Sequence, residues 1–220
     1  MRFLHPGLLV ICNDVKPGRK KRIQPTLKSD KNMLKEIIQS FLPWILYFVL
    51  LGQTQQRLEL AILVATFTSI AFEFKALKKG FILSWGTLLF FVSMLVAVII
   101  FKNKWIVNYV WILSNSALAL IVWISILIRR PFTIQYAKEK VSQDKWHHPL
   151  FLKINYLLSA VWGLMFLVGV ALNVLRLLNP LFNPWFYEIL SYIPSIFAIW
   201  FTLWFPDWYK EKYLRENKLL

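Results

Sequence analysis

Residues 81–101 and residues 106–128 are two long segments of this sequence that each contain no charged residue. A helix needs about 20 predominantly apolar residues to cross the roughly 30 Å hydrocarbon layer of a bilayer, and both segments reach that length. A chain inside lipid must also satisfy its own backbone hydrogen bonds, which a helix does within one segment. The two segments therefore predict an all-α, polytopic membrane protein.

The composition excludes several other classes of protein. Of the 220 residues, 58% are hydrophobic and 17% are charged, and the mean hydropathy is +0.52, whereas soluble domains are about 45–50% apolar and about 25% charged. An ordinary soluble globule and a disordered chain are therefore excluded, and the single cysteine excludes a disulfide scaffold. The net charge of +15 is typical of nucleic-acid binders, but 11 Trp and 18 Phe are not, so we expect no nucleic-acid partner.

Six segments are candidates for membrane spans, and the third, fourth and fifth are the clearest. The first is short and has Pro43 near its start, the second is also short, and Pro194 interrupts the sixth. The first two could instead form a shallow hairpin that does not cross fully, and a protein with five spans is a separate alternative. The six segments are residues 37–51, 58–74, 81–101, 106–128, 154–175 and 189–205.

The basic residues in the connections support the six-span count. Lysine and arginine concentrate in the cytoplasmic loops of membrane proteins. With six spans, 22 of the 26 Lys and Arg residues fall on one side of the membrane and 4 on the other. This split predicts that both termini are cytoplasmic and that the basic side contacts an anionic phospholipid leaflet. Five spans would break the alternation.

The same reading divides the chain into three regions. Residues 1–35 form a basic extension that we expect to be disordered or to lie on anionic headgroups. Residues 36–205 form the transmembrane domain, and residues 206–220 form a charged cytoplasmic tail. Because Met33 begins a stretch typical of a membrane-protein start, residues 1–32 are interpreted as a dispensable extension or a misassigned start.

The segment after the fourth span is the most distinctive part outside the membrane. Its proline is expected to end the span, and its two arginines can extend to the lipid headgroups. An apolar stripe at helical spacing, which includes Ala137, then predicts a short amphipathic helix between spans four and five. Such a helix fits the inner leaflet, and a partner protein could dock on it equally well. The candidate contact residues are Arg129, Arg130, Pro131, Ile134, Lys138 and Val141.

A few polar or amphipathic side chains inside the spans are candidates for a functional site. Glu73 is followed by Lys75, Lys78 and Lys79, so it forms either an interfacial ion pair or a proton- or cation-binding site. Asparagines in the fourth and fifth spans either join helices by hydrogen bonds or line a polar path between them. The complete set of intramembrane candidates is Glu73, Asn115, Trp162 and Asn173.

Small residues at four-residue spacing, including Ala61, Ala65 and Ser69, permit close helix contacts within the chain or in a homo-oligomer. The sequence contains no catalytic motif, and His147 and His148 have no accompanying carboxylate or cysteine cluster. We therefore expect a protein that is not an enzyme and that uses no metal or other cofactor.

The order of several short motifs resembles that of a known bacterial family. Phe41-Leu42-Pro43 opens the first span and Arg129-Arg130-Pro131 ends the fourth. In the fifth span Trp162, Phe166, Gly169 and Asn173 follow one another. This pattern, over residues 33–205, resembles the intracellular septation protein A family, also called inner membrane-spanning protein YciB. The basic N-terminal extension and the length of residues 133–150 depart from the family pattern.

The resemblance implies a multi-pass protein of the bacterial inner membrane that is not an enzyme. It implies a role in cell-envelope biogenesis or septation, through contacts with division or wall-synthesis membrane proteins. The alternative from the residues themselves is a small transporter or lipid-handling protein, in which Glu73, Asn115 and Asn173 line an internal polar path.

Overall fold

The structure is a computed structural model that describes residues 39–52, 54–139, 141–179 and 184–216. These residues form an all-α protein, which confirms the predicted fold class. Residues 1–35, the expected basic extension, lie outside the described part. The helices are α3 (Leu42–Leu50), α4 (Gln55–Lys78), α5 (Ile82–Leu95, continued by a π-helix at Val96–Ile100), α6 (Trp105–Leu127), α7 (Phe132–Lys138), α8 (Pro149–Leu178) and α9 (Pro184–Glu216), with a 3-10 turn at Gln143–Lys145.

Five of the described helices are long and apolar enough to cross a membrane: α4, α5 with its π-helical continuation, α6, α8 and α9. The protein is therefore a multi-pass membrane protein. The second expected span, which seemed short, is a helix of 24 residues. The described part of the first expected span forms α3, whose nine residues extend only about 14 Å at 1.5 Å per residue. The count of full-length helices thus agrees with the five-span alternative.

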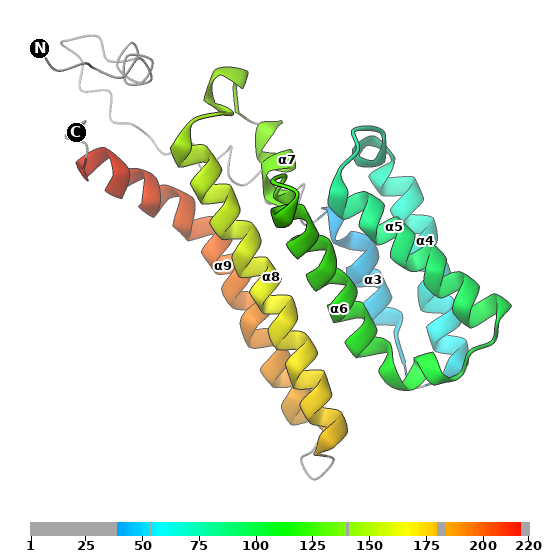
Figure 1. The fold of residues 1–220 in the computed structure, drawn as a ribbon. Helices are drawn as coiled ribbons and strands as arrows, with labels where there is room; N and C mark the ends of the chain where they lie inside the picture. Colours follow the sequence, from blue (N-terminus) through cyan, green and yellow to red (C-terminus); the bar gives the residue numbers. More distant parts are fainter. Residues whose placement is uncertain (1–38, 53, 140, 180–183, 217–220) are drawn as a thin grey trace, which may run out of the picture.

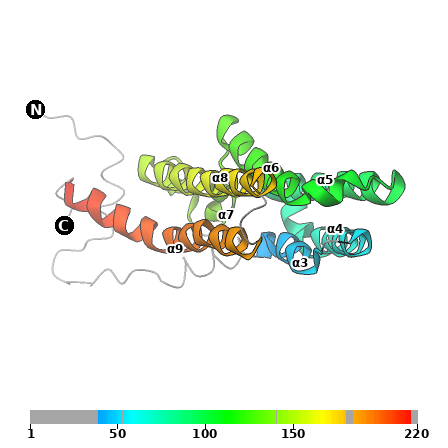
Figure 2. The same cartoon turned by 90° about the horizontal axis from the view of Figure 1, so that it is seen from below.

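The five long helices and the short helix α3 form two layers (Figure 2). One layer contains α5, α6 and α8, and the other contains α3, α4 and α9. Neighbouring long helices run antiparallel, so α4, α6 and α9 end at the end of the bundle where α5 and α8 begin (Figure 1). The short helix α7 lies at that same end, between the end of α6 and the start of α8.

The short helix α3 packs one face into the bundle, while Ile45 and Val49 on its other face are 44% and 71% exposed. Trp44 and Tyr47 are fully buried, and the indole N–H of Trp44 donates to Thr87 Oγ1 of α5 over 2.8 Å. The ring of Phe48 stacks on Trp111 of α6 with centroids 5.3 Å apart. Just before α3, Phe41 stacks on Trp162 of α8 at 5.1 Å. The helix that is too short to cross the membrane therefore joins three that are long enough.

Helices α4 and α6 end with the same backbone arrangement. After α4, Phe81 N–H donates to Ala76 O and Gly80 N–H to Leu77 O, with Gly80 at φ +73°. After α6, Arg130 N–H donates to Ser125 O and Arg129 N–H to Ile126 O, with Arg129 at φ +59°. This is the Schellman motif, which needs one residue in the left-handed region and usually has glycine there. Arginine at that position is unusual.

The last helix, α9, continues beyond the expected sixth span. It runs to Glu216 and contains Pro194 and Pro206. Ion pairs from Lys212 to Glu216 (3.8 Å) and from Glu211 to Arg215 (3.6 Å) join successive turns of its final part. The described part of the expected charged tail is therefore helical.

Candidate functional site: a basic groove beside α7

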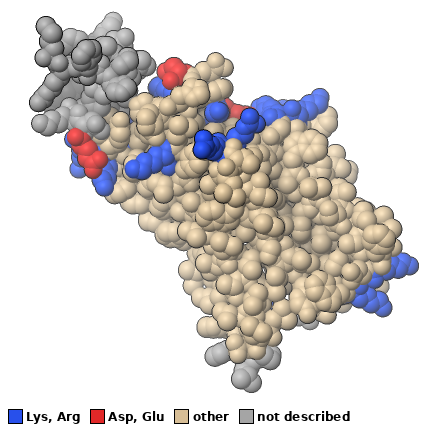
Figure 3. Space-filling view, viewed as in Figure 1, with Lys and Arg blue, Asp and Glu red and all other residues tan. Residues whose placement is uncertain are grey.

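Most of the basic side chains of the described residues lie at the end of the bundle that carries α7, which we call the basic end (Figure 3). The segments at this end contribute Lys75, Lys78, Lys79, Arg129, Arg130, Lys138, Lys145, Lys153, Lys210, Lys212 and Arg215. The segments at the opposite end contribute Arg57, Lys102, Lys104 and Arg176. The antiparallel arrangement of the helices thus brings basic segments that are far apart in the sequence to one end.

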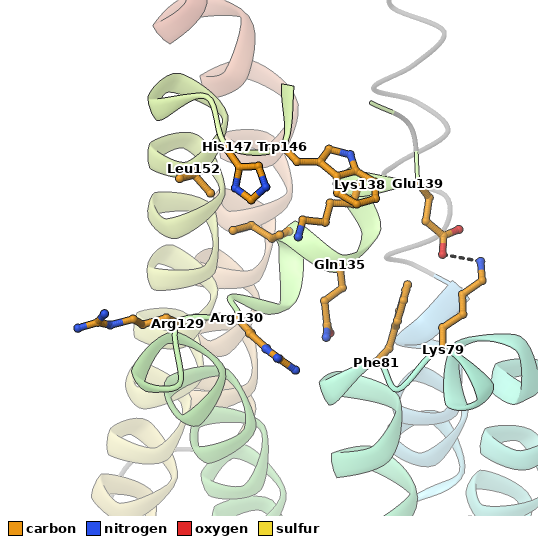
Figure 4. Close-up of a pocket in the computed structure, with 11 residues that line it drawn as sticks. Lys79, Phe81, Arg129, Arg130, Gln135, Lys138, Glu139, Trp146, His147 and Leu152 are labelled. Atoms are coloured by element: carbon orange, nitrogen blue, oxygen red, sulfur yellow. Dashed lines mark hydrogen bonds and ion pairs between the residues drawn. The ribbon is translucent and has the colours of Figure 1, made fainter. Parts of the chain in front are cut away.

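A cleft of about 650 Å³ opens at the basic end beside α7, and we call it the α7 groove (Figure 4). The turn after α4, the turn after α6, helix α7 and the connection to α8 build its walls. It is lined by Lys79, Phe81, Arg129, Arg130, Ile134, Gln135, Lys138, Glu139, Trp146, His147 and Leu152. Four of the six residues predicted from the segment after the fourth span therefore line one cleft.

Hydrogen bonds fix α7 to the neighbouring helices. Thr133 Oγ1 lies 2.8 Å from both Asn155 O and Ser159 Oγ of α8. The side-chain oxygen of Gln135 accepts the N–H of Ile82 at 2.9 Å, which caps the first turn of α5. A buried hydrogen bond of this kind contributes about 1 kcal/mol to stability. Together they fix α7 as one wall of the groove.

The predicted apolar stripe of α7 packs against the protein, and this corrects the expectation that it faces lipid. Ile134 and Ala137 are buried, with 6% and 5% of their surface exposed, because α7 packs along α8. Helix α7 ends at Lys138, so Val141 lies beyond it and is only half-buried. The backbone oxygen of Val141 instead accepts the indole N–H of Trp146 at 2.9 Å. The surface of this segment that stays available is its basic side.

The groove carries several positive charges without an acidic partner. Glu139 forms an ion pair with Lys79 at 2.5 Å, as the dashed line in Figure 4 shows. Among the residues that the structure describes, no acidic side chain pairs with Arg129, Arg130 or Lys138. The ammonium of Lys138 lies 4.9 Å from the ring centre of Trp146, which restricts its position.

The two arginines take different directions from the turn that follows α6. In Figure 4, Arg130 points toward Gln135 across the groove, while Arg129 points away from the other labelled side chains. Both side chains are exposed. The next residue, Pro131, is buried and precedes the first residue of α7. It fixes the bend between the two helices, since proline restricts both its own backbone and that of the preceding residue.

Glu73 does not form the interfacial ion pair considered above. Only 2% of it is exposed, and neither carboxylate oxygen has a hydrogen-bond partner among the described residues. Ser84 of α5 is a neighbouring polar side chain. On α7, Tyr136 lies close enough to both residues to interact with them, and burial raises the pKa of its hydroxyl, which stays neutral. Helix α4 thus turns Glu73 into the protein, away from its exposed lysine neighbours.

The other intramembrane candidates lie elsewhere and have partners. Asn115 donates to Trp111 O at 2.9 Å and Asn173 donates to Gly169 O at 2.7 Å, each within its own helix. Both lie at the contact of α6 with α8, because the Asn115 side chain packs onto Gly169. The indole N–H of Trp162 donates to Thr202 Oγ1 of α9 at 3.1 Å. Asn115 thus packs on Gly169, whose carbonyl oxygen accepts from Asn173, and Glu73 lies elsewhere, beside Ser84 and Tyr136.

The small residues of the second expected span also have contacts inside the chain. Ala61, Ala65 and Ser69 are fully buried, and they lie on α4, which packs against α3 and α5. This stripe is therefore occupied within the monomer and is not a free surface for a second copy.

Several groove residues were not identified from the sequence. Lys79 and Phe81 follow α4, about 50 residues before Arg129 in the sequence, and Gln135 falls between the residues of the apolar stripe. The available signal was that basic pairs follow both the second and the fourth spans. His147 also lines the groove, whereas His148 Nδ1 accepts the N–H of Leu150 at 3.2 Å and caps α8. Within the described ranges, no group of three His, Cys, Asp or Glu side chains could hold a metal.

The chemistry of the groove is that of an anion-binding site. The guanidinium of Arg130 and the ammonium of Lys138 offer donors suited to phosphate oxygens, Arg129 adds a positive charge at the edge of the cleft, and the aromatic rings offer an apolar wall. Comparison with family models, with curated proteins and with solved structures found no match to this chain. The fold and the groove therefore carry the functional argument by themselves.

Proposed function

We propose that this multi-pass membrane protein is not an enzyme and that it binds the phosphate headgroup of an anionic phospholipid in the α7 groove. The observation that carries the proposal is the placement of Arg129, Arg130 and Lys138 around one cleft without an acidic partner in the described part of the chain. Each Lys or Arg near an anionic membrane surface contributes about 1 kcal/mol to binding.

A lipid fits this site better than a soluble anion because apolar surface adjoins the groove. Leu127 and Ile128, at the end of α6, are 76% and 52% exposed and come directly before Arg129. An acyl chain can lie along this surface while the headgroup phosphate occupies the cleft. A soluble phosphate would leave the apolar surface uncovered.

The test is the affinity for short-chain phosphatidylglycerol in detergent, measured by native mass spectrometry. The double variant Arg130→Gln, Lys138→Gln should bind more weakly, by about fivefold for each charge removed. The matched control is Lys102→Gln, Lys104→Gln, which removes two basic residues at the opposite end and should leave the affinity unchanged.

Two outcomes would contradict the proposal. One is equal binding of zwitterionic phosphatidylcholine, and the other is an equal loss of affinity in the control variant. Addition of inorganic phosphate separates the two possible anions. Full competition would show that the groove recognises phosphate alone, whereas weak competition is expected if the acyl chains contribute.

The proposed orientation places the basic end on the cytoplasmic side of a bacterial inner membrane. Its support is the concentration of described basic residues at that end (Figure 3), together with the tendency of Lys and Arg to stay in the cytoplasm. In a chain whose native cysteine is replaced by Cys12→Ser, Lys145→Cys and Lys104→Cys should each react with an impermeant thiol reagent, from opposite sides of the membrane. Labelling of both from the same side would contradict it.

The proposed cellular role is in envelope biogenesis or septation, through lipid contacts and through division or wall-synthesis membrane proteins. This part of the proposal is based on the motif order that resembles the septation protein family. In-cell crosslinking from Lys145, beside the groove, should capture such proteins. Unchanged cell length and unchanged osmotic and detergent resistance in a deletion strain would contradict the role.

A further inference from the structure

We propose that Glu73 is a proton-binding site inside the bundle and that the bound proton holds α7 in its docked position. Three side chains from three helices form this site: Glu73 of α4, Ser84 of α5 and Tyr136 of α7. We call them the Glu73 cluster. The proposal is independent of lipid binding in the groove.

The cluster is buried, and its oxygen atoms lie close enough together to interact with one another. Glu73 is 2% exposed, Ser84 is fully buried and Tyr136 is 2% exposed. Both carboxylate oxygens, Ser84 Oγ and the Tyr136 hydroxyl have no hydrogen-bond partner among the described residues. The Tyr136 hydroxyl nevertheless lies next to the hydroxyls of Ser84 and Ser40. Four oxygen atoms of one cluster are thus left with unused hydrogen-bonding capacity.

A single proton resolves this arrangement. An ionised carboxylate without a partner is strongly disfavoured in an apolar interior. When one carboxylate oxygen takes up a proton from water, the negative charge is removed and the resulting O–H can donate to a neighbouring hydroxyl. The unprotonated oxygen of the same carboxyl group can then accept a hydrogen bond from the other hydroxyl. A metal cation would instead need several ligands around a space of its own, and the cluster lines neither the α7 groove nor the cleft beside Trp208 and Lys212 on α9.

Among the residues that the structure describes, the charged and titratable groups around the cluster do not supply a counter-charge. Lys75 and Lys78 of α4 and Lys79 in the turn after it are exposed, and Lys79 is paired with Glu139. Helix α3 contributes only Tyr47, which lies next to Ser114 of α6, and the α5 helix Ile82–Leu95 contains no charged residue. On α7, Lys138 lies over Trp146.

Helix α7 is the element that would respond to loss of the proton. Tyr136 is buried, and its ring packs edge-on against Phe81, the residue just before α5, with ring centroids 4.9 Å apart. Ionised Glu73 would be stabilised by water, and displacement of the seven-residue helix that carries Tyr136 would admit water to the cluster. Rising pH should therefore favour undocking of α7, whereas a proton on Glu73 favours docking.

Infrared spectroscopy of the full chain in nanodiscs tests the proton directly. The difference spectrum between wild type and Glu73→Gln should contain the carbonyl stretch of a protonated carboxylic acid at neutral pH. Ser84→Ala should shift this band because it removes a hydrogen-bonding neighbour. The control Glu59→Gln changes the other glutamate of α4, which accepts from Gln55 at 3.0 Å near the opposite end, and should leave the band intact. Absence of the band, or its loss in the control, would overturn the proposal.

Hydrogen exchange tests the consequence for α7. At each pH the amides of α7 are compared between wild type and Glu73→Gln, so that the intrinsic pH dependence of exchange cancels. Exchange in wild type should become faster relative to the variant as pH rises, by up to about tenfold per pH unit. A constant ratio, or a ratio that follows sodium concentration in place of pH, would overturn the proposal.

Discussion

The indole N–H of Trp44 and the hydroxyl of Thr87 are 2.8 Å apart in the centre of the protein, although 43 residues separate them in the sequence. Thr87→Val keeps the shape of the side chain but leaves the buried N–H of Trp44 without an acceptor. Such a loss costs about 1–3 kcal/mol. The measurement is the free energy of unfolding in mixed micelles.

The control for this prediction is Thr66→Val, another buried threonine. Its hydroxyl donates to Ile62 O of the same helix at 2.7 Å, so its loss leaves no donor unsatisfied and should change stability by much less. Equal effects of the two substitutions would show that the Trp44–Thr87 bond has no special role.

Gly169 of α8 is in close contact with Asn115 of α6. A Cβ atom added at this position would lie 2.4 Å from Asn115 Oδ1, so Gly169→Ala should destabilise the protein by about 1–3 kcal/mol. Asn115→Ala in the same chain should recover most of this loss because it removes the clash. Additive effects of the two substitutions, measured by thermal unfolding in detergent, would contradict the contact.

Arg129 combines a charge with a strained backbone at φ +59°. Glycine adopts this conformation without the strain, which for other residues is about 1 kcal/mol or more. Arg129→Gly should therefore raise the unfolding temperature while it lowers the affinity for phosphatidylglycerol. Arg130→Gly should lower the affinity without raising the unfolding temperature, since Arg130 has no positive φ. A loss of stability in Arg129→Gly would contradict the strain argument.

Glu139 is the acidic residue that lines the groove, and it holds Lys79 in an ion pair. The two side chains are 28% and 53% exposed, so the pair contributes only about 0–1 kcal/mol to stability. Glu139→Gln should leave the fold almost unaffected and should bind anionic lipid several times more tightly, with a steeper dependence on salt. Glu211→Gln, which frees Arg215 on α9, is the matched control and should not change the affinity.

The membrane class and the third to fifth spans could be predicted from the sequence, because an apolar segment of about 20 residues without charge is typical of a membrane-spanning helix. The role of α3 could not be predicted in this way. Span prediction depends on length and hydropathy, whereas the position of α3 depends on the contacts of aromatic residues such as Trp44. Its position depends on three other helices that come later in the chain.

The candidate site was predicted only in part, because the sequence does not show which face of each helix points into the protein. The basic turn at Arg129 was visible because charge next to a span is a local signal. The burial of Glu73 was not, because three lysines follow within six residues and favour an exposed ion pair in the sequence. Only the contact of α4 with α5 and α7 determines that Glu73 faces inward. For the same reason Ile134 was expected to face lipid, whereas the structure buries it within the protein.

The contacts of α3 and the residue before it have a consequence for how the protein is made. Phe41, Trp44 and Phe48 contact α8, α5 and α6 in turn, and Trp162 of α8 is synthesised 121 residues after Phe41, on which it stacks. The aromatic core therefore cannot close until most of the chain has left the ribosome and entered the bilayer. Until then, a short segment rich in tryptophan and phenylalanine has no permanent neighbours, which makes the order of insertion, and not only the final packing, a condition for correct assembly.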